Sequence, residues 1–212
     1  MFIILFLFLA TGLFSVKEKK FHQRISTYFQ KDFPKKFKCK IIGDALKKSI
    51  KQIPKDAIID AKNIHIKLIY HKKYGTRIKL MGVNEVFEDR FSYMEKIFEF
   101  IKPFVQKQSY KQFNTKYKLF KASRSMVRLR KKYTKNAYLE FKLKKNLIIQ
   151  VKEYKNDKSQ MSMWIKYKKI KNFVLPVFFK IFLYDDKKMR TLRFRLKDFN
   201  FMPKITEEDF LG

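Results

Sequence analysis

The sequence predicts an α+β fold, in which a long antiparallel sheet follows helical segments and early strands. Three observations predict it: runs of alternating apolar and basic residues between Asn136 and Phe199, an apolar stripe at helical spacing over residues 85–105, and turn-forming pairs between the runs. Because side chains on a strand point to alternate faces, each run predicts a strand with one apolar and one polar face. Several such strands in succession predict a sheet with a large apolar surface on one side and positive charge on the other.

The first residues form an apolar stretch, Phe2–Ala10, and the first charged side chain is Lys17. A helix of about fourteen residues would span ~21 Å, which is less than the ~30 Å hydrocarbon core of a bilayer. The length is typical of the apolar region of a secretory signal, and small side chains allow cleavage after Gly12 or Ser15. We therefore expect residues 1–15 to be a signal peptide or a short N-terminal anchor, and the protein to be periplasmic. The alternative is a buried element of the fold.

Residues 16–212 are long enough for a single domain with a substantial core. The chain is 46% hydrophobic and 17% aromatic, so its formal net charge of +32 does not indicate disorder. The lysine excess has two explanations: codon bias, or an anionic partner such as a membrane surface, an acidic polymer or a nucleic acid. Cys39 is the only cysteine, which excludes an intrachain disulfide, and we expect it to be a partly buried apolar residue.

One helix and three strands are predicted ahead of the long run of strands. Residues 17–31 carry apolar side chains at helical spacing, and Pro34 ends this amphipathic helix. The stretch 45–53 fits both a helix turn and a two-sided strand. A hairpin turn is predicted at Tyr74-Gly75. The three strands are predicted over residues 37–42, 64–70 and 76–81.

The strongest helical pattern covers residues 85–105, with Asn84 as a plausible N-cap and acidic side chains in the first turn. Pro103 stands where this helix should fray. The stripe predicts a helix that packs on the sheet as a lid. Its apolar residues are Phe87, Phe91, Met94, Ile97, Phe98 and Ile101.

Polar turn pairs such as Asn156-Asp157 and Lys171-Asn172 separate the later strands. Seven strands are predicted in this part, over residues 116–122, 125–130, 138–143, 147–154, 161–167, 174–184 and 189–199.

The motifs of common enzyme classes are missing: the chain has no phosphate loop, no glycine-rich dinucleotide turn and no paired-histidine zinc helix. His22, His65 and His71 are too scattered to predict a metal site, and residues 207–209 are expected to be a solvated acidic tail. Basic residues alternate with aromatic ones over residues 116–120, but no RNA-binding motif accompanies them. We therefore expect no catalytic site, no metal and no cofactor.

The C-terminal part carries a pattern of two strands with defined ends. Ile170–Pro176 (IKNFVLP) precedes a strand over residues 177–184, and the next strand ends in Leu196–Pro203 (LKDFNFMP). The pattern closes on Asp209-Phe210. This pattern and the order of elements resemble the LolA-like family of periplasmic lipoprotein carriers and its lipid-binding relatives. The resemblance implies a curved, incomplete antiparallel β-barrel whose concave apolar face is covered by helices and accepts acyl chains. The family's functional arginine on an early strand has no clear counterpart here.

The apolar faces of the later strands are the candidate ligand-binding surface, beneath the predicted lid. One acyl chain of about fourteen carbons represents on the order of 11 kcal/mol of gross transfer free energy, at ~0.8 kcal/mol per CH₂ group. The candidate residues on this face are Leu139, Phe141, Leu143, Leu147, Ile149, Val151, Met161, Met163, Ile165, Phe179, Ile181, Leu183, Leu192, Phe194 and Leu196.

These observations predict a non-enzymatic carrier or chaperone of the cell envelope. Its ligands would be lipid or lipoprotein acyl chains, and an inner-membrane donor complex and an anionic membrane surface would be its partners. The first alternative is an envelope scaffold with a closed core, which binds an anionic membrane or an acidic partner through its basic face. The second alternative is a cytoplasmic nucleic-acid binder.

Overall fold

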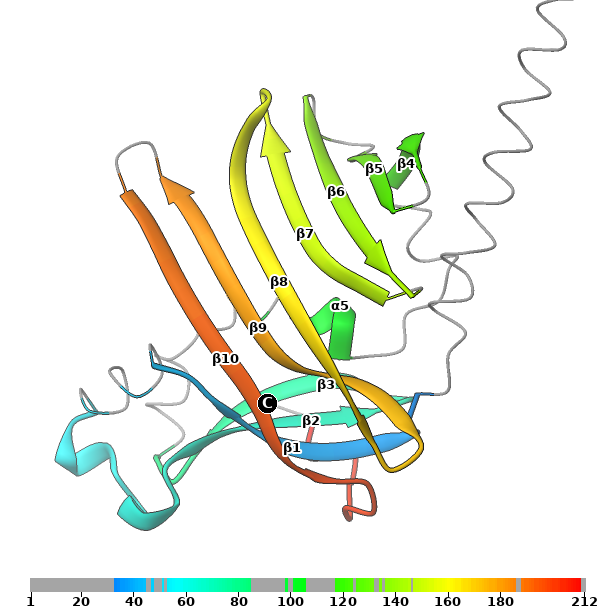
Figure 1. Ribbon diagram of the computed structural model, residues 1–212. Helices are drawn as coiled ribbons and strands as arrows, with labels where there is room; N and C mark the ends of the chain where they lie inside the picture. The colour runs from blue at the N-terminus through cyan, green and yellow to red at the C-terminus, as the bar shows by residue number, and fades with distance from the viewer. Residues whose placement is uncertain are drawn as a thin grey trace, which may run out of the picture. The chain divides into compact units, whose positions relative to one another are not determined.

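The computed structural model describes residues 33–44, 47, 51, 53–84, 98, 101–105, 117–123, 125–131, 134, 136–145, 147–185 and 188–210. These residues form one ten-stranded antiparallel sheet with the strand order β3-β2-β1-β10-β9-β8-β7-β6-β5-β4 (Figure 1). The strands are β1 (Lys36–Ile42), β2 (His65–His71), β3 (Gly75–Met81), β4 (Tyr117–Ala122), β5 (Met126–Lys131), β6 (Ala137–Lys144), β7 (Leu147–Lys155), β8 (Lys158–Ile170), β9 (Phe173–Asp185) and β10 (Lys188–Asn200).

The antiparallel sheet predicted from alternation is confirmed, and its last three strands are longer than predicted. β8, β9 and β10 have 13 residues each. The turn at Asn156-Asp157 is also confirmed, because both residues have positive φ, 51° and 60°, as a two-residue hairpin turn requires. Lys171, with a φ of 52°, marks the turn between β8 and β9.

The predicted α+β class is wrong, because the described part of the chain is almost entirely sheet. The helices whose bounds are described are α5 (Lys102–Val105) and two short 3-10 helices, η1 (Lys55–Ala57) and η2 (Ala61–Asn63). Within that part no helical lid covers the sheet, so the helix-covered barrel is wrong as well. A stripe at helical spacing shows where apolar side chains would lie if a helix formed, but short helices gain their stability from tertiary packing.

Most of the predicted lid lies outside the described residues, as do the predicted signal peptide, 1–15, and the predicted helix over 17–31. Of the lid range, the structure describes Phe98 and residues 101–105. Pro103, where the sequence predicts that the helix frays, stands in the first turn of α5. Proline is tolerated there, because the N–H that it lacks would have no partner in the helix.

The chain divides into two compact units, each described by itself below. Unit 1 comprises residues 1–31, 108–163 and 183–189, and unit 2 comprises residues 32–107, 164–182 and 190–212. The single domain expected for residues 16–212 stays a prediction.

The core of unit 2 is built from the apolar faces of β1, β2 and β10. Phe37 pairs with Tyr70 and Cys39 with Leu68 across β1 and β2, and all four side chains are buried. Directly opposite residues point to the same face, so these pairs make one continuous apolar layer. Phe194 of β10 is also buried, with 0% exposure.

The core of unit 1 follows the same rule across β5, β6 and β7. Val127 pairs with Phe141, and Phe141 pairs with Val151; all three side chains are buried. On the opposite face, Gln150 and Ser162 are buried with 8% and 4% exposure. The Gln150 side-chain amide donates a hydrogen bond of 3.3 Å to the Ser162 hydroxyl, which gives both buried groups a partner.

Candidate functional site

The structure buries most of the apolar residues that the sequence singles out. Leu139, Phe141, Val151, Met161, Met163, Ile165, Phe179, Ile181, Phe194 and Leu196 are buried. The half-buried ones are Leu143, Leu147, Ile149, Leu183 and Leu192. Of the lid residues, Phe98 and Ile101 are buried. Phe87, Phe91, Met94 and Ile97 lie outside the described residues.

In unit 2 the apolar face of the sheet contacts rings of the chain itself. The ring centroid of Phe98 lies 5.6 Å from that of Phe194, and the centroid of Phe104 lies 6.5 Å from that of Phe179. These distances are those of direct aromatic packing. At these two positions rings from outside the sheet cover its apolar face, which favours a closed core over a guest molecule. Acyl-chain binding elsewhere on the predicted surface stays a prediction.

The other face of β8, β9 and β10 in unit 2 is basic. Residues 164–182 and 190–197 contain no Asp or Glu. Lys166, Arg193 and Arg195 are exposed on this face, because they alternate with the buried Ile165, Phe194 and Leu196. The cations of the two segments are Lys166, Lys168, Lys169, Lys171, Lys180, Arg190, Arg193, Arg195 and Lys197.

Aromatic side chains stand among these cations. The Lys166 ammonium lies 5.6 Å from the ring centroid of Phe178, and the Arg195 guanidinium lies 5.8 Å from the same centroid. The Lys180 ammonium lies 4.7 Å from the ring centroid of Phe182. Each contact contributes about 0.5 to 1 kcal/mol at an exposed site. Trp164, on the same face of β8 as Lys166, is 42% exposed. We call Trp164, Lys166, Phe178, Lys180, Phe182, Arg193 and Arg195 the aromatic–basic face.

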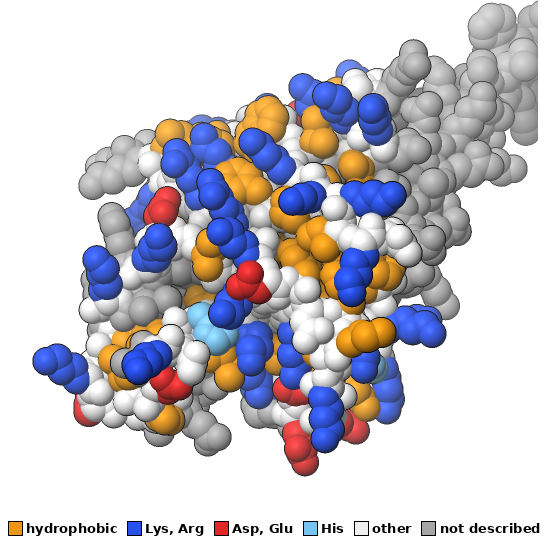
Figure 2. Space-filling model, turned by 60° about the horizontal axis from the view of Figure 1, so that its bottom comes forward, with side chains coloured by type: hydrophobic (Ala, Val, Ile, Leu, Met, Phe, Trp, Pro, Cys, Tyr) orange, Lys and Arg blue, Asp and Glu red, His pale blue; other side chains and the backbone are white. Residues whose placement is uncertain are grey.

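In Figure 2, lysine and arginine side chains are interspersed with hydrophobic ones on the face turned toward the viewer, where acidic side chains are fewer than basic ones. Like charges so close together raise the local positive potential, which attracts anions. The arrangement can therefore bind an extended anionic surface, but it offers no nucleophile paired with a base.

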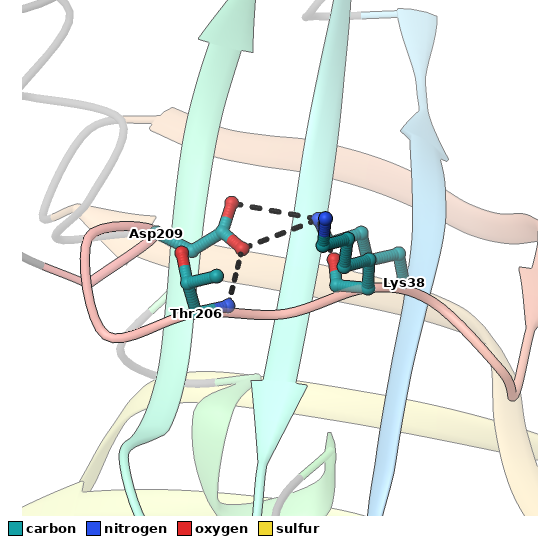
Figure 3. A network of polar contacts seen from close by, with 4 residues as sticks. Lys38, Thr206 and Asp209 are labelled. Atoms are coloured by element: carbon teal, nitrogen blue, oxygen red, sulfur yellow. Dashed lines mark hydrogen bonds and ion pairs between the residues drawn. The ribbon is translucent and has the colours of Figure 1, made fainter.

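In unit 2 the carboxylate of Asp209, in the C-terminal segment, contacts a lysine of β1. The Lys38 ammonium donates to both oxygens of Asp209, at 3.3 and 3.4 Å, and the backbone N–H of Thr206 donates to Asp209 Oδ2 at 3.2 Å (Figure 3). Desolvation alone would raise the pKa of Asp209. This effect is outweighed by the hydrogen bonds from Thr206 and Lys38 and by the charges of Lys38 and Lys79. The pKa of Asp209 therefore lies below its ordinary value.

The other polar side chains considered from the sequence make contacts within the protein, where the structure describes them. His71 stacks on Tyr74 with ring centroids 4.8 Å apart, and a ring nitrogen of His65 lies 2.6 Å from the carbonyl oxygen of Asn63. Among the described residues, no three His, Cys, Asp or Glu side chains gather as metal ligands would. Cys39 is buried, as expected, and burial together with the charge of Asp198 raises the pKa of its thiol.

Sequence reasoning identified a basic face but missed its aromatic side chains on β9. Phe178 and Phe182 alternate with the buried Phe179 and Ile181. Phe178 therefore faces cations of the neighbouring strands, and Phe182 faces Lys180 of β9 itself. An apolar run on both faces of a strand was the available signal, because it predicts that the outer face is covered or binds something.

The comparisons with known proteins gave no match: no protein-family model, no curated protein and no solved structure is similar to this chain. In the described part of the chain, no helix has the length and apolar character needed to span a bilayer.

Proposed function

We propose that this protein is a non-enzymatic module of the cell envelope that docks on anionic membrane surfaces through its aromatic–basic face. The observation that carries the proposal is the acid-free stretch of strands on which the exposed Lys166 and Arg195 lie over Phe178, with Lys180 over Phe182. Near an anionic bilayer each Lys or Arg adds about 1 kcal/mol of attraction. Charge alone binds reversibly, and an amphipathic ring such as Trp164 adds a second contact at headgroup depth.

The aromatic side chains favour a membrane over a nucleic acid as the partner. A base binds by stacking on a bare ring, with a contribution of about 1 to 3 kcal/mol. In this structure cations already lie over Phe178 and Phe182. Membrane binding does not need a bare ring face, because rings that lie between basic groups can enter the headgroup layer of a bilayer edge first.

The test is cosedimentation with vesicles of phosphatidylcholine, alone or with a third of phosphatidylglycerol. The wild type should pellet with the anionic vesicles, and raising the salt from about 0.1 M to about 1 M should release it, since the Debye length falls from ~10 to ~3 Å. The triple variant Lys166→Gln, Arg193→Gln, Arg195→Gln should bind roughly a hundredfold more weakly, because it loses about 3 kcal/mol.

The matched control changes exposed lysines of unit 1: Lys144→Gln, Lys155→Gln and Lys158→Gln. This variant has the same net charge as the test variant and should keep most of the binding. Equal losses in the two variants, equal binding to neutral vesicles, or displacement of the protein from vesicles by a short single-stranded RNA would refute the proposal.

A further inference from the structure

Four lysines of unit 2 lie directly opposite one another on four neighbouring strands. Lys197 of β10 pairs with Lys40 of β1, Lys40 pairs with Lys67 of β2, and Lys67 pairs with Lys79 of β3. Directly opposite residues of antiparallel strands point to the same face, so the four ammonium groups share one face of the sheet. Neighbouring strands are about 4.8 Å apart, so this lysine row spans on the order of 15 Å.

The row is an unfavourable arrangement for folding alone. Like charges directly opposite each other on a sheet are destabilising. Lys67 and Lys79 are only half-exposed, so water screens their charges incompletely. Desolvation lowers the pKa of Lys67, and the neighbouring charges of Lys38, Lys40 and Lys79 lower it further, while the charge of Asp209 offsets part of this shift.

Little negative charge compensates the row. Lys40 has Asp198 at 3.9 Å, an exposed pair that contributes little. Within the residues that the structure describes, no carboxylate lies within ion-pair distance of Lys67, Lys79 or Lys197. The row therefore presents a localised positive potential on a partly desolvated surface.

The molecule itself places an anionic group beside this row. Asp209 reaches Lys38, which precedes Lys40 on the same face of β1, and its charge also interacts with Lys67 and Lys79. The carboxylate is held by one ammonium and one backbone N–H. Such a pair of donors also suits a phosphate oxygen.

We propose that the lysine row is a binding site for a group that carries two or more phosphates. Two ammonium groups about 5 Å apart can both donate to one phosphate, so four in line match a diphosphate or a longer chain. The group can be a free polyphosphate or part of a lipid headgroup. The proposal does not depend on membrane docking, because a soluble phosphate chain needs no bilayer.

The direct test is titration calorimetry of the full chain with pyrophosphate. The wild type should bind it, and the double variant Lys67→Gln, Lys79→Gln should bind at least about tenfold more weakly, because each charge-assisted hydrogen bond is worth about that factor or more. The control variant Lys144→Gln, Lys155→Gln has the same net charge and should bind like the wild type. Since the double variant loses a like-charge repulsion, it should unfold at or above the wild-type temperature, which separates lost binding from lost folding.

A second pair of variants removes a negative charge instead of positive ones. Asp209→Asn removes the carboxylate beside the row and should tighten pyrophosphate binding several-fold, whereas Glu208→Gln, one residue away and exposed, should change it little. Equal effects of these two variants, unchanged binding in Lys67→Gln, Lys79→Gln, or equal affinity for a short polyglutamate would overturn the proposal.

Vesicles distinguish the sources of the phosphate. The protein is compared on vesicles that contain a bisphosphorylated lipid and on phosphatidylglycerol vesicles of equal charge. If the wild type prefers the former and Lys67→Gln, Lys79→Gln does not, the row binds a lipid headgroup. Pyrophosphate binding without any such preference would assign it to a soluble ligand. If pyrophosphate binds and no vesicle does, the membrane proposal fails and the phosphate site stands.

Discussion

Replacing Phe194 with alanine tests whether the two faces of β10 have separate roles. Phe194 is fully buried, and its ring centroid lies 5.6 Å from that of Phe98. Removing a buried phenylalanine costs about 3 to 5 kcal/mol, from lost transfer free energy and the cavity left behind. With a denaturant slope of about 2 to 3 kcal/mol/M, the urea midpoint should fall by about 1 to 2.5 M.

The neighbouring residue on the other face is the matched comparison. Arg195 is exposed and contacts the ring of Phe178, so Arg195→Gln should cost no more than about 1 kcal/mol in stability. Arg195→Gln should instead weaken binding to anionic vesicles. Phe194→Ala should keep that binding at urea concentrations at which it is still folded. If both variants shift the urea midpoint equally, the assignment of faces on β10 is wrong.

Three further outcomes follow from the described contacts. The Cys39 thiol is 2% exposed with a raised pKa, so it should resist Ellman's reagent in the folded protein and react fully in urea; a full equivalent reacting without urea would contradict its burial. Because the pKa of Asp209 is depressed in the folded state, its contribution to holding the C-terminal segment is complete above the ordinary carboxyl pKa of about 3.9 and is lost as the pH falls through the folded-state value. The amide NMR signal of Thr206, which donates to this carboxylate, should report that loss, and a similar acid transition in Asp209→Asn would assign it to another group. Ser162→Ala leaves the buried Gln150 amide without its acceptor and should cost about 1 to 3 kcal/mol in urea unfolding, most of which Gln150→Met should restore; a neutral Ser162→Ala would show that water satisfies the amide.

The strands are the part of the predicted fold that the structure confirms, whereas most of the predicted helical residues lie outside the described ones. Alternation places Leu196 inside and Arg195 outside wherever β10 pairs, because the side-chain period of a strand is two residues. The apolar stripe over residues 85–105 carries no comparable constraint, since a short helix depends on what it packs against. Pro103 stands in the first turn of α5, and α5 ends at Val105, where the predicted helix also ends.

The sequence predicts the positive charge of the candidate sites but not which side chains come together in them. The sequence shows that residues 164–182 and 190–197 contain cations and no acids. It does not show that the cations of β8 and β10 meet over Phe178 of β9, because that contact depends on which strands are neighbours.

The sequence by itself determined which residues share a face wherever a strand alternates without a bulge, as at Arg195 and Leu196, and therefore which face is positive and which is apolar there. Only the tertiary structure decided the strand order and register that bring Lys197, Lys40, Lys67 and Lys79 into one row, although they lie far apart along the chain. The physical reason is that alternation is a property of one strand, whereas register is set by pairing between strands and by bulges such as the one opposite residues 38–40.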